Sequence, residues 1–193
     1  MKNDEQSLTR FRGHVTCCWL TVVKHAANAA AQHVRWDITT LSTDVVPGGS
    51  ASATAADGST ITLTGSGTFV APASASGSSR AATGGGTWKI FPPGSSTASA
   101  SGTTYQAEGL VRFDEAPGSL TGVNDLIREL EDAQAGLAIL RIAYSDGDRG
   151  VLAFSCSLPS SPAPIPEGVS ASKSFVDFFN IVQQPVTIFH VAD

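Results

Sequence analysis

The amino-acid sequence predicts an all-β fold: a single-domain antiparallel barrel or sandwich of about eight strands, with one inserted helix and a separate N-terminal helical segment. The first observation behind this prediction is the alternation of hydrophobic and polar residues from Val34 onward, which is typical of half-buried strands. The second is Asp57-Gly58 between two strand-like runs, a strong signal for a two-residue hairpin turn, in which both residues need a positive φ. The third is that hydrophobic residues follow a convincing helical spacing in only one stretch, Val123–Ala135.

The N-terminal segment, residues 1–33, differs from the β domain that we assign to residues 34–193. A charged start, an apolar run at Val15–Val23 and small residues at Ala26–Ala31 follow one another in the order of a signal peptide. Acidic residues in the charged start, and Lys24 before the small residues, argue against that reading. The alternatives are a peripheral helix and an extension that lies outside the fold.

In the first half of the β domain, we expect strands where hydrophobic and polar residues alternate. These strands cover Val34–Thr39, Ser50–Ala56, Ser59–Leu63, Gly67–Val70, Thr87–Phe91 and Thr104–Phe113. Pro72–Gly86 is dominated by Ser, Gly and Ala without any period, so we expect a flexible loop there. In the last and longest strand, strict alternation predicts that Tyr105 lies on one face, while Glu108 and Leu110 share the other.

The second half of the β domain begins with the predicted helix. Leu126, Ile127 and Leu130 have helical spacing, and Gly136 is placed to end the helix. After it, we expect a hairpin of Leu137–Tyr144 and Val151–Leu158, followed by an extended proline-rich connection at Pro159–Pro166. The pattern of Gly168–Phe179 fits either a helix or a strand, and Val186–Val191 is expected to form the terminal strand.

Composition excludes some partners and leaves others open. The chain has a net charge of −5 and no run of Lys or Arg, which argues against electrostatic binding of nucleic acid. No stretch approaches the ~18 apolar residues that a membrane-spanning helix requires. We therefore expect neither a nucleic-acid nor a membrane partner, and the oligomeric state stays open.

The cysteines bear on the cellular compartment. Cys17, Cys18 and Cys156 are odd in number and two are adjacent, so they cannot form a disulfide framework. This pattern favours a cytoplasmic location, whereas secretion follows if residues 1–33 act as a signal.

No metal or cofactor is expected from the sequence. On a helix His14 and His25 would stand ~16 Å apart, too far to share one ion. Asp146 and Asp148 resemble the start of a calcium loop, but Ser157 stands where the loop requires a glutamate.

Motifs for nucleophilic catalysis and for phosphate binding are absent from the sequence: it contains no GxSxG, no GxGxxG and no P-loop. A triad built on His190 is geometrically conceivable, because triads are assembled in space. A strand-borne histidine with a structural partner is the simpler interpretation of His190.

The candidate ligand-binding residues are aromatic and charged side chains on the long strands. The charged ones are solvated if they face outward, whereas charges that converge inside a barrel with the aromatic rings would make an apolar pocket with a few orienting groups. The candidates are Trp36, Trp88, Tyr105, Glu108, Arg112, Arg141, Lys173 and Asp177.

Three hypotheses of function follow. The first is a small β-barrel-like protein that binds a small, partly apolar ligand. The second is a metal-independent barrel-cavity enzyme, an isomerase, cyclase or hydrolase, which needs at least two of the charged candidates within hydrogen-bond reach. The third is a structural or assembly module that uses its outer Ser, Thr and Gly faces.

Overall fold

The computed structural model describes residues 31–72, 80–162, 165–182 and 186–192, and these residues form a nearly all-β structure. Thirteen strands belong to one sheet, and the only helical element among the described residues is a 3₁₀ turn, η1 (Leu130–Asp132). The strands are β1 (Gln32–Leu41), β2 (Asp44–Pro47), β3 (Ser50–Ala55), β4 (Thr60–Thr64), β5 (Ser66–Ala71), β6 (Ala82–Phe91), β7 (Ala100–Ala116), β8 (Asn124–Asp125), β9 (Ala133–Tyr144), β10 (Arg149–Cys156), β11 (Gly168–Lys173), β12 (Val176–Val182) and β13 (Thr187–Ala192). The described part contains no helix that is long and apolar enough to cross a membrane.

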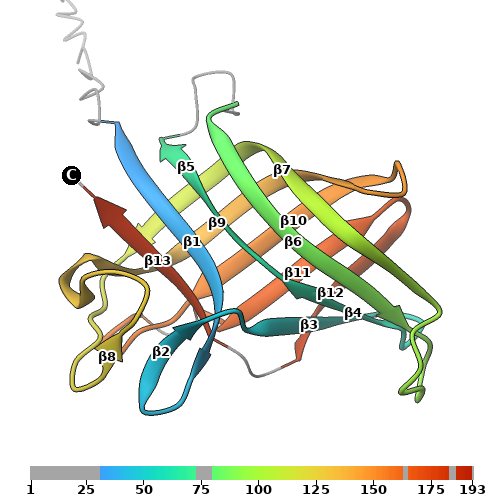
Figure 1. The fold of residues 1–193 in the computed structure, drawn as a ribbon, viewed down its shortest axis with the longest axis horizontal. Coiled ribbons are helices and arrows are strands. Elements are labelled where there is room, and N and C mark those ends of the chain that lie inside the picture. The colour runs from blue at the N-terminus through green and yellow to red at the C-terminus, as the bar shows by residue number, and fades with distance from the viewer. Residues whose placement is uncertain (1–30, 73–79, 163–164, 183–185, 193) are drawn as a thin grey trace, which may run out of the picture.

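Strand pairing returns to its starting point at β9. From β9 the antiparallel pairings run through β10, β11, β12, β3, β4, β6 and β7, and β7 pairs with β9 again. A second series leads from β9 through β13, β1 and β5 to β6. In Figure 1, β1, β5 and β6 cross in front of β9, β10 and β11, so the core lies between two layers of strands.

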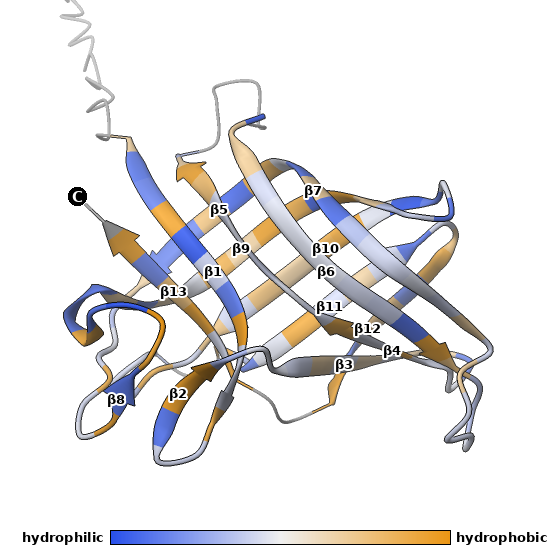
Figure 2. Cartoon of the chain, viewed as in Figure 1, coloured by the Kyte–Doolittle hydropathy of each residue, from blue (hydrophilic) through white to orange (hydrophobic). Residues whose placement is uncertain are grey.

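The expectation of about eight strands was too low, because the short strands β2 and β8 were not expected and the ambiguous segment Gly168–Phe179 contains β11 and the start of β12. Strands without hydrophobic alternation were also predicted too short. Part of the expected loop Pro72–Gly86 belongs to β6, which begins at Ala82. A Cβ on Gly85 (φ +153°) would lie 1.9 Å from the Tyr105 carbonyl oxygen, so glycine allows the backbones to pair closely here. Figure 2 shows β3 and much of β6 in pale colours, as expected for Ala, Ser, Thr and Gly.

The predicted helix Val123–Ala135 is wrong. Its residues form β8, the turn η1 and the start of β9. The carboxylate of Asp125 accepts the backbone N–H of Ile127 at 2.9 Å, which gives the chain a local turn in place of a helical hydrogen bond. Leu126, which would belong to the apolar face of a helix, is 59% exposed.

The N-terminal helical segment cannot be compared with the structure, because residues 1–30 lie outside the described residues. The structure includes only the end of that segment, where β1 begins at Gln32, close to the predicted start of the β pattern at Val34.

Strict alternation also failed on the long strand β7. Its pairing with β9 shifts register between Ala107 and Gly109 and again between Leu110 and Arg112. Each bulge inserts a residue and reverses which faces the later side chains occupy. Tyr105 and Leu110 are therefore both buried, although alternation predicts opposite faces for them.

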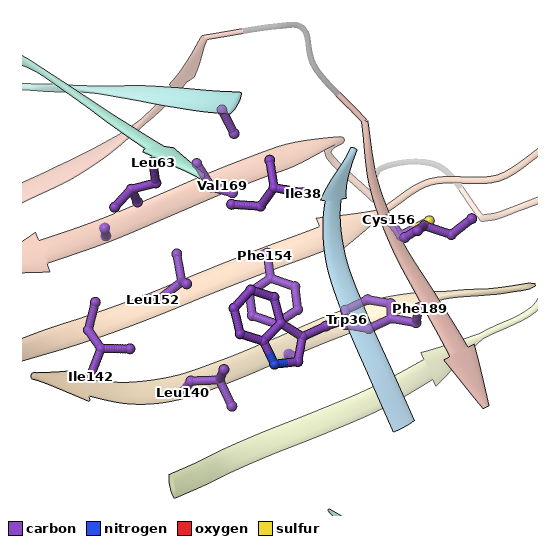
Figure 3. Close-up of a cluster of buried hydrophobic side chains, with 14 of the residues drawn as sticks. Trp36, Ile38, Leu63, Leu140, Ile142, Leu152, Phe154, Cys156, Val169 and Phe189 are labelled. Atoms are coloured by element: carbon purple, nitrogen blue, oxygen red, sulfur yellow. The ribbon is translucent and has the colours of Figure 1, made fainter. Parts of the chain in front are cut away.

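The core consists of aromatic and aliphatic side chains from both layers of strands. Trp36 from β1 packs on Phe154 from β10 with ring centroids 5.1 Å apart, and Phe154 stacks on Phe189 from β13 at 5.2 Å. Figure 3 shows these rings with Leu140 and Leu152 beside them. Burial of these apolar surfaces is the main force that holds the two layers together.

Candidate functional site

The three aromatic candidates belong to the packed core. Trp36, Trp88 and Tyr105 are each at most 2% exposed. The indole N–H groups of Trp36 and Trp88 have no hydrogen-bond partner among the described residues. Trp88 packs edge-on against Tyr144, with ring centroids 5.6 Å apart. The rings therefore stabilise the interior, and none of the three lines the groove that contains charged candidates.

Lys173 is buried at one end of this interior, where β11 ends. Its ammonium nitrogen lies 2.6 Å from a carboxylate oxygen of Asp146 and also contacts Asp148, both in the hairpin turn between β9 and β10. The same nitrogen lies 4.7 Å from the centroid of the Trp88 ring and 5.2 Å from that of Tyr144, which is within cation–π range.

The two carboxylates control the protonation of Lys173. Burial acts to lower the pKa of Lys173, but the hydrogen bonds and charges of Asp146 and Asp148 outweigh it, so this pKa is raised. The hydrogen bond from Lys173 is also the main cause that lowers the pKa of Asp148. The two carboxylates that resemble the start of a calcium loop therefore form ion pairs with Lys173. Among the described residues, no group of three His, Cys, Asp or Glu side chains could hold a metal ion.

Two charged candidates, Glu108 and Arg141, line a groove on the outer face of β7, β9 and β10, without a hydrogen bond or ion pair between them. This arginine groove has a volume of about 830 Å³, and three arginines contribute to it. Its lining residues are Arg80, Glu108, Arg141, Ile142, Arg149, Gly150 and Val151.

The strand pattern explains why charged side chains line this groove. On β9, Leu140 and Ile142 are buried in the core, whereas Arg141 between them is only half-buried, on the opposite face of the strand. Arg141 is paired in register with Val151 on β10 and with Gly109 on β7. The side chain of Arg141 therefore lies between neighbours that are small or apolar and carry no charge.

Positive charge in the groove is only partly balanced. A guanidinium nitrogen of Arg149 lies 3.7 Å from a carboxylate oxygen of Glu108, and both side chains are exposed. Arg80 and Arg141 form no ion pair within the described ranges of the chain. Three guanidinium groups thus face one carboxylate, in a chain whose net charge is −5.

The other charged candidates do not join this groove. Arg112 forms an exposed ion pair with Asp114 on its own strand, and Lys173 lies in the buried cluster described above. Asp177 lines a separate groove over β10, β11 and β12. The five charged candidates therefore occupy four places instead of converging inside the fold.

His190 has a structural partner, as expected of a strand-borne histidine. Its Nε2 lies 2.7 Å from a carboxylate oxygen of Asp125, and both side chains are fully buried. The other ring nitrogen, Nδ1, has no partner among the described residues. This pair connects β13 to the segment that was expected to be a helix, and its burial keeps it from any substrate in solvent.

Sequence reasoning missed Arg80 and Arg149, which precede β6 and begin β10, respectively. Neither residue interrupts a hydrophobic pattern, so only the pairing of distant strands brings them to the groove.

Comparisons of this chain with protein-family models, with curated proteins and with solved structures found no match.

Proposed function

We propose that the protein is a small β-barrel-like binding protein and that its small, partly apolar ligand is an anion held in the arginine groove. The barrel is supported by strand pairings that leave β9 in one direction and return to it in the other. The observation that carries the binding proposal is the gathering of Arg80, Arg141 and Arg149 beside a single carboxylate. Guanidinium groups bind carboxylates and phosphates through paired, charge-assisted hydrogen bonds.

An external groove fits the packing better than an internal site does. Trp36 packs against Phe154, and Trp88 packs against Tyr144. The rings that were expected to line an internal pocket are therefore already in contact with other core side chains. In the arginine groove, Ile142 and Val151 provide apolar surface next to the guanidinium groups. That combination suits a ligand with one anionic group and an apolar body.

Binding of phenyl phosphate and benzoate, measured by isothermal titration calorimetry at neutral pH, tests the proposal. We expect Arg141→Gln to weaken binding by about tenfold, since a hydrogen bond to a charged group contributes ~1.5–3 kcal/mol and the groove is partly open to water. Arg112→Gln is the matched control, because Arg112 is exposed on β7 and paired with Asp114 outside the groove. Equal weakening in both variants, or equal binding of benzyl alcohol, would contradict an anion site in this groove.

The two other hypotheses stay predictions with less support. For an enzyme, Glu108 is the only carboxylate among the described residues that line the groove, and it already faces Arg149. For an assembly module, the outer Ser and Thr hydroxyls of β3 and β4 are partly occupied by each other, as in the 2.7 Å contact between Ser52 and Thr62.

A further inference from the structure

A second groove adjoins the arginine groove and differs from it in chemistry. This apolar shelf, about 480 Å³ in volume, lies over the outer faces of β10, β11 and β12. Val151 lines both grooves, so the two adjoin at this residue. The shelf is lined by Val151, Ala153, Ser170, Ala171, Ser172, Asp177, Phe178 and Phe179.

The shelf has exposed apolar side chains at both of its ends. Val151, beside the arginines, is 37% exposed, and Phe179 on β12 is 58% exposed. The pairing of β12 with β3 shifts register between Phe178 and Asn180, so Phe179 is the extra residue of a bulge. Bulges re-aim side chains, and here Phe178 is buried while Phe179 lies on the outer surface.

Small residues lie between these two ends. Ala153 on β10 is paired in register with Ser170 on β11, and both are half-buried. Side chains this short leave a shallow floor over which an extended apolar chain can lie. Across three strand spacings, from β9 to β12, the distance is ~14 Å.

We propose that the ligand of the arginine groove is an amphiphile with an anionic head and an unbranched apolar tail of medium length. The carboxylate or phosphate head binds Arg141, and the tail crosses the shelf past Val151 to Phe179. This inference rests on the proposed function and specifies the ligand of that same site. Asp177 at the β12 end repels an anion there, so the charges on the two ends of the surface fix the orientation of the ligand.

A series of alkyl carboxylates tests the proposal: butanoate, octanoate and dodecanoate, titrated below the concentrations at which they form micelles. We expect each added CH₂ group to tighten binding about two- to fourfold until the tail reaches Phe179. Arg141→Gln should weaken every member of the series by a common factor, without changing the dependence on chain length.

Phe179→Ser should reduce the gain in affinity with chain length, while the affinity for butanoate, which is too short to reach Phe179, stays unchanged. Val182→Ser is the matched control, since Val182 is an exposed apolar residue on the same strand, 43% exposed, and does not line the shelf. Ser170→Asp is a second test that removes no apolar residue, and it should weaken dodecanoate binding more than butanoate binding by placing a charge on the shelf floor.

The outcomes separate the two proposals. Equal affinity for all three carboxylates, or an equal length dependence in Phe179→Ser and Val182→Ser, would overturn the amphiphile and leave the anion site intact. Failure of every alkyl carboxylate to bind would overturn the amphiphile alone if phenyl phosphate and benzoate still bind, and both proposals if these two ligands fail as well. Binding to vesicles containing an anionic phospholipid, without binding of the single amphiphiles, would replace the amphiphile with a membrane surface.

Discussion

The interior around Trp36 and the interior around Trp88 are both aromatic, yet they are stabilised differently. Near Trp36, the rings of Phe154 and Phe189 pack on one another without any polar group on them. Near Trp88, the rings of Tyr105 and Tyr144 carry hydroxyl groups, and the ammonium group of Lys173 lies over the rings of Trp88 and Tyr144.

The tyrosine hydroxyl groups in the second region are retained because each has a partner. The Tyr105 hydroxyl donates to the Thr64 carbonyl at 2.9 Å, and the Tyr144 hydroxyl donates to the Ser172 carbonyl at 2.8 Å. A buried polar group without a partner costs stability, whereas a paired one fixes the relative position of two strands. The comparison suggests that the apolar region supplies most of the stability and the polar region fixes how the strands align.

The largest effect is expected from Phe154→Ala in the apolar region. Removing a fully buried ring leaves a cavity and should lower the free energy of unfolding by about 3–5 kcal/mol. Urea denaturation followed by tryptophan fluorescence measures this change. Phe175→Ala is the control, because Phe175 is fully exposed and its loss should have little effect. Similar losses in both variants would show that the apolar region is not the main source of stability.

Lys173→Met should have a smaller effect, in the polar region. Methionine keeps apolar contact with the rings but loses the attraction to Asp146 and Asp148, so we expect a loss of about 1–2 kcal/mol in the same denaturation experiment. The loss stays below that of a fully buried ion pair, because both aspartates are accessible to water. Unchanged stability would mean that this ion pair contributes nothing net to the fold.

Removing one hydroxyl group should have a still smaller effect. Tyr105→Phe and Tyr144→Phe each lose one hydrogen bond and leave one carbonyl group without its partner, at a cost of about 1 kcal/mol each. A loss as large as that of Phe154→Ala in either single variant would contradict the division into two regions.

Near neutrality the smallest effect is expected from pH, whereas alkaline pH should lower the stability of the fold. Burial raises the pKa of Tyr105 and of Tyr144, and the two aspartates raise that of Lys173. Groups with raised pKa lose protons first in the unfolded chain, so stability is fully present below pH ~10 and falls as the pH rises above it. These are the only two tyrosines of the chain, so phenolate absorbance should appear only together with unfolding. Phenolate formation in the folded protein would contradict this burial.

Local patterns in the sequence predicted those parts of the fold that depend on neighbouring residues. A hairpin at Asp57-Gly58 joins β3 to β4, as expected, but only Gly58 has a positive φ (83°), so the two-residue turn with positive φ at both residues is not formed. The hairpin of β9 and β10 is also confirmed. In both cases the alternation of side chains and the turn residues lie within one short stretch of chain.

Features that depend on distant strands were missed or mistaken. The segment around Asp125 has the composition of a helix, but its carboxylate is used by His190 on β13, far along the chain. The arginine groove likewise needs residues near the start of β6, in β7, in β9 and at the start of β10. Glu108 and Arg141 could be proposed because they interrupt strand patterns, whereas nothing local distinguishes Arg80 or Arg149.

The return of the strand pairings to β9 has a consequence for how the chain folds. β3 can complete its pairing only when β12 is available, and β1 can do so only when β13 is available. Strands near the start of the sequence thus depend on strands near its end. Closing such long loops costs entropy before any contact compensates for it, which makes folding slow for a chain of this size. Until closure, β1 and β3 expose edges that can pair with other chains. The rate at which the last strands arrive therefore sets how long the nascent protein is vulnerable to aggregation.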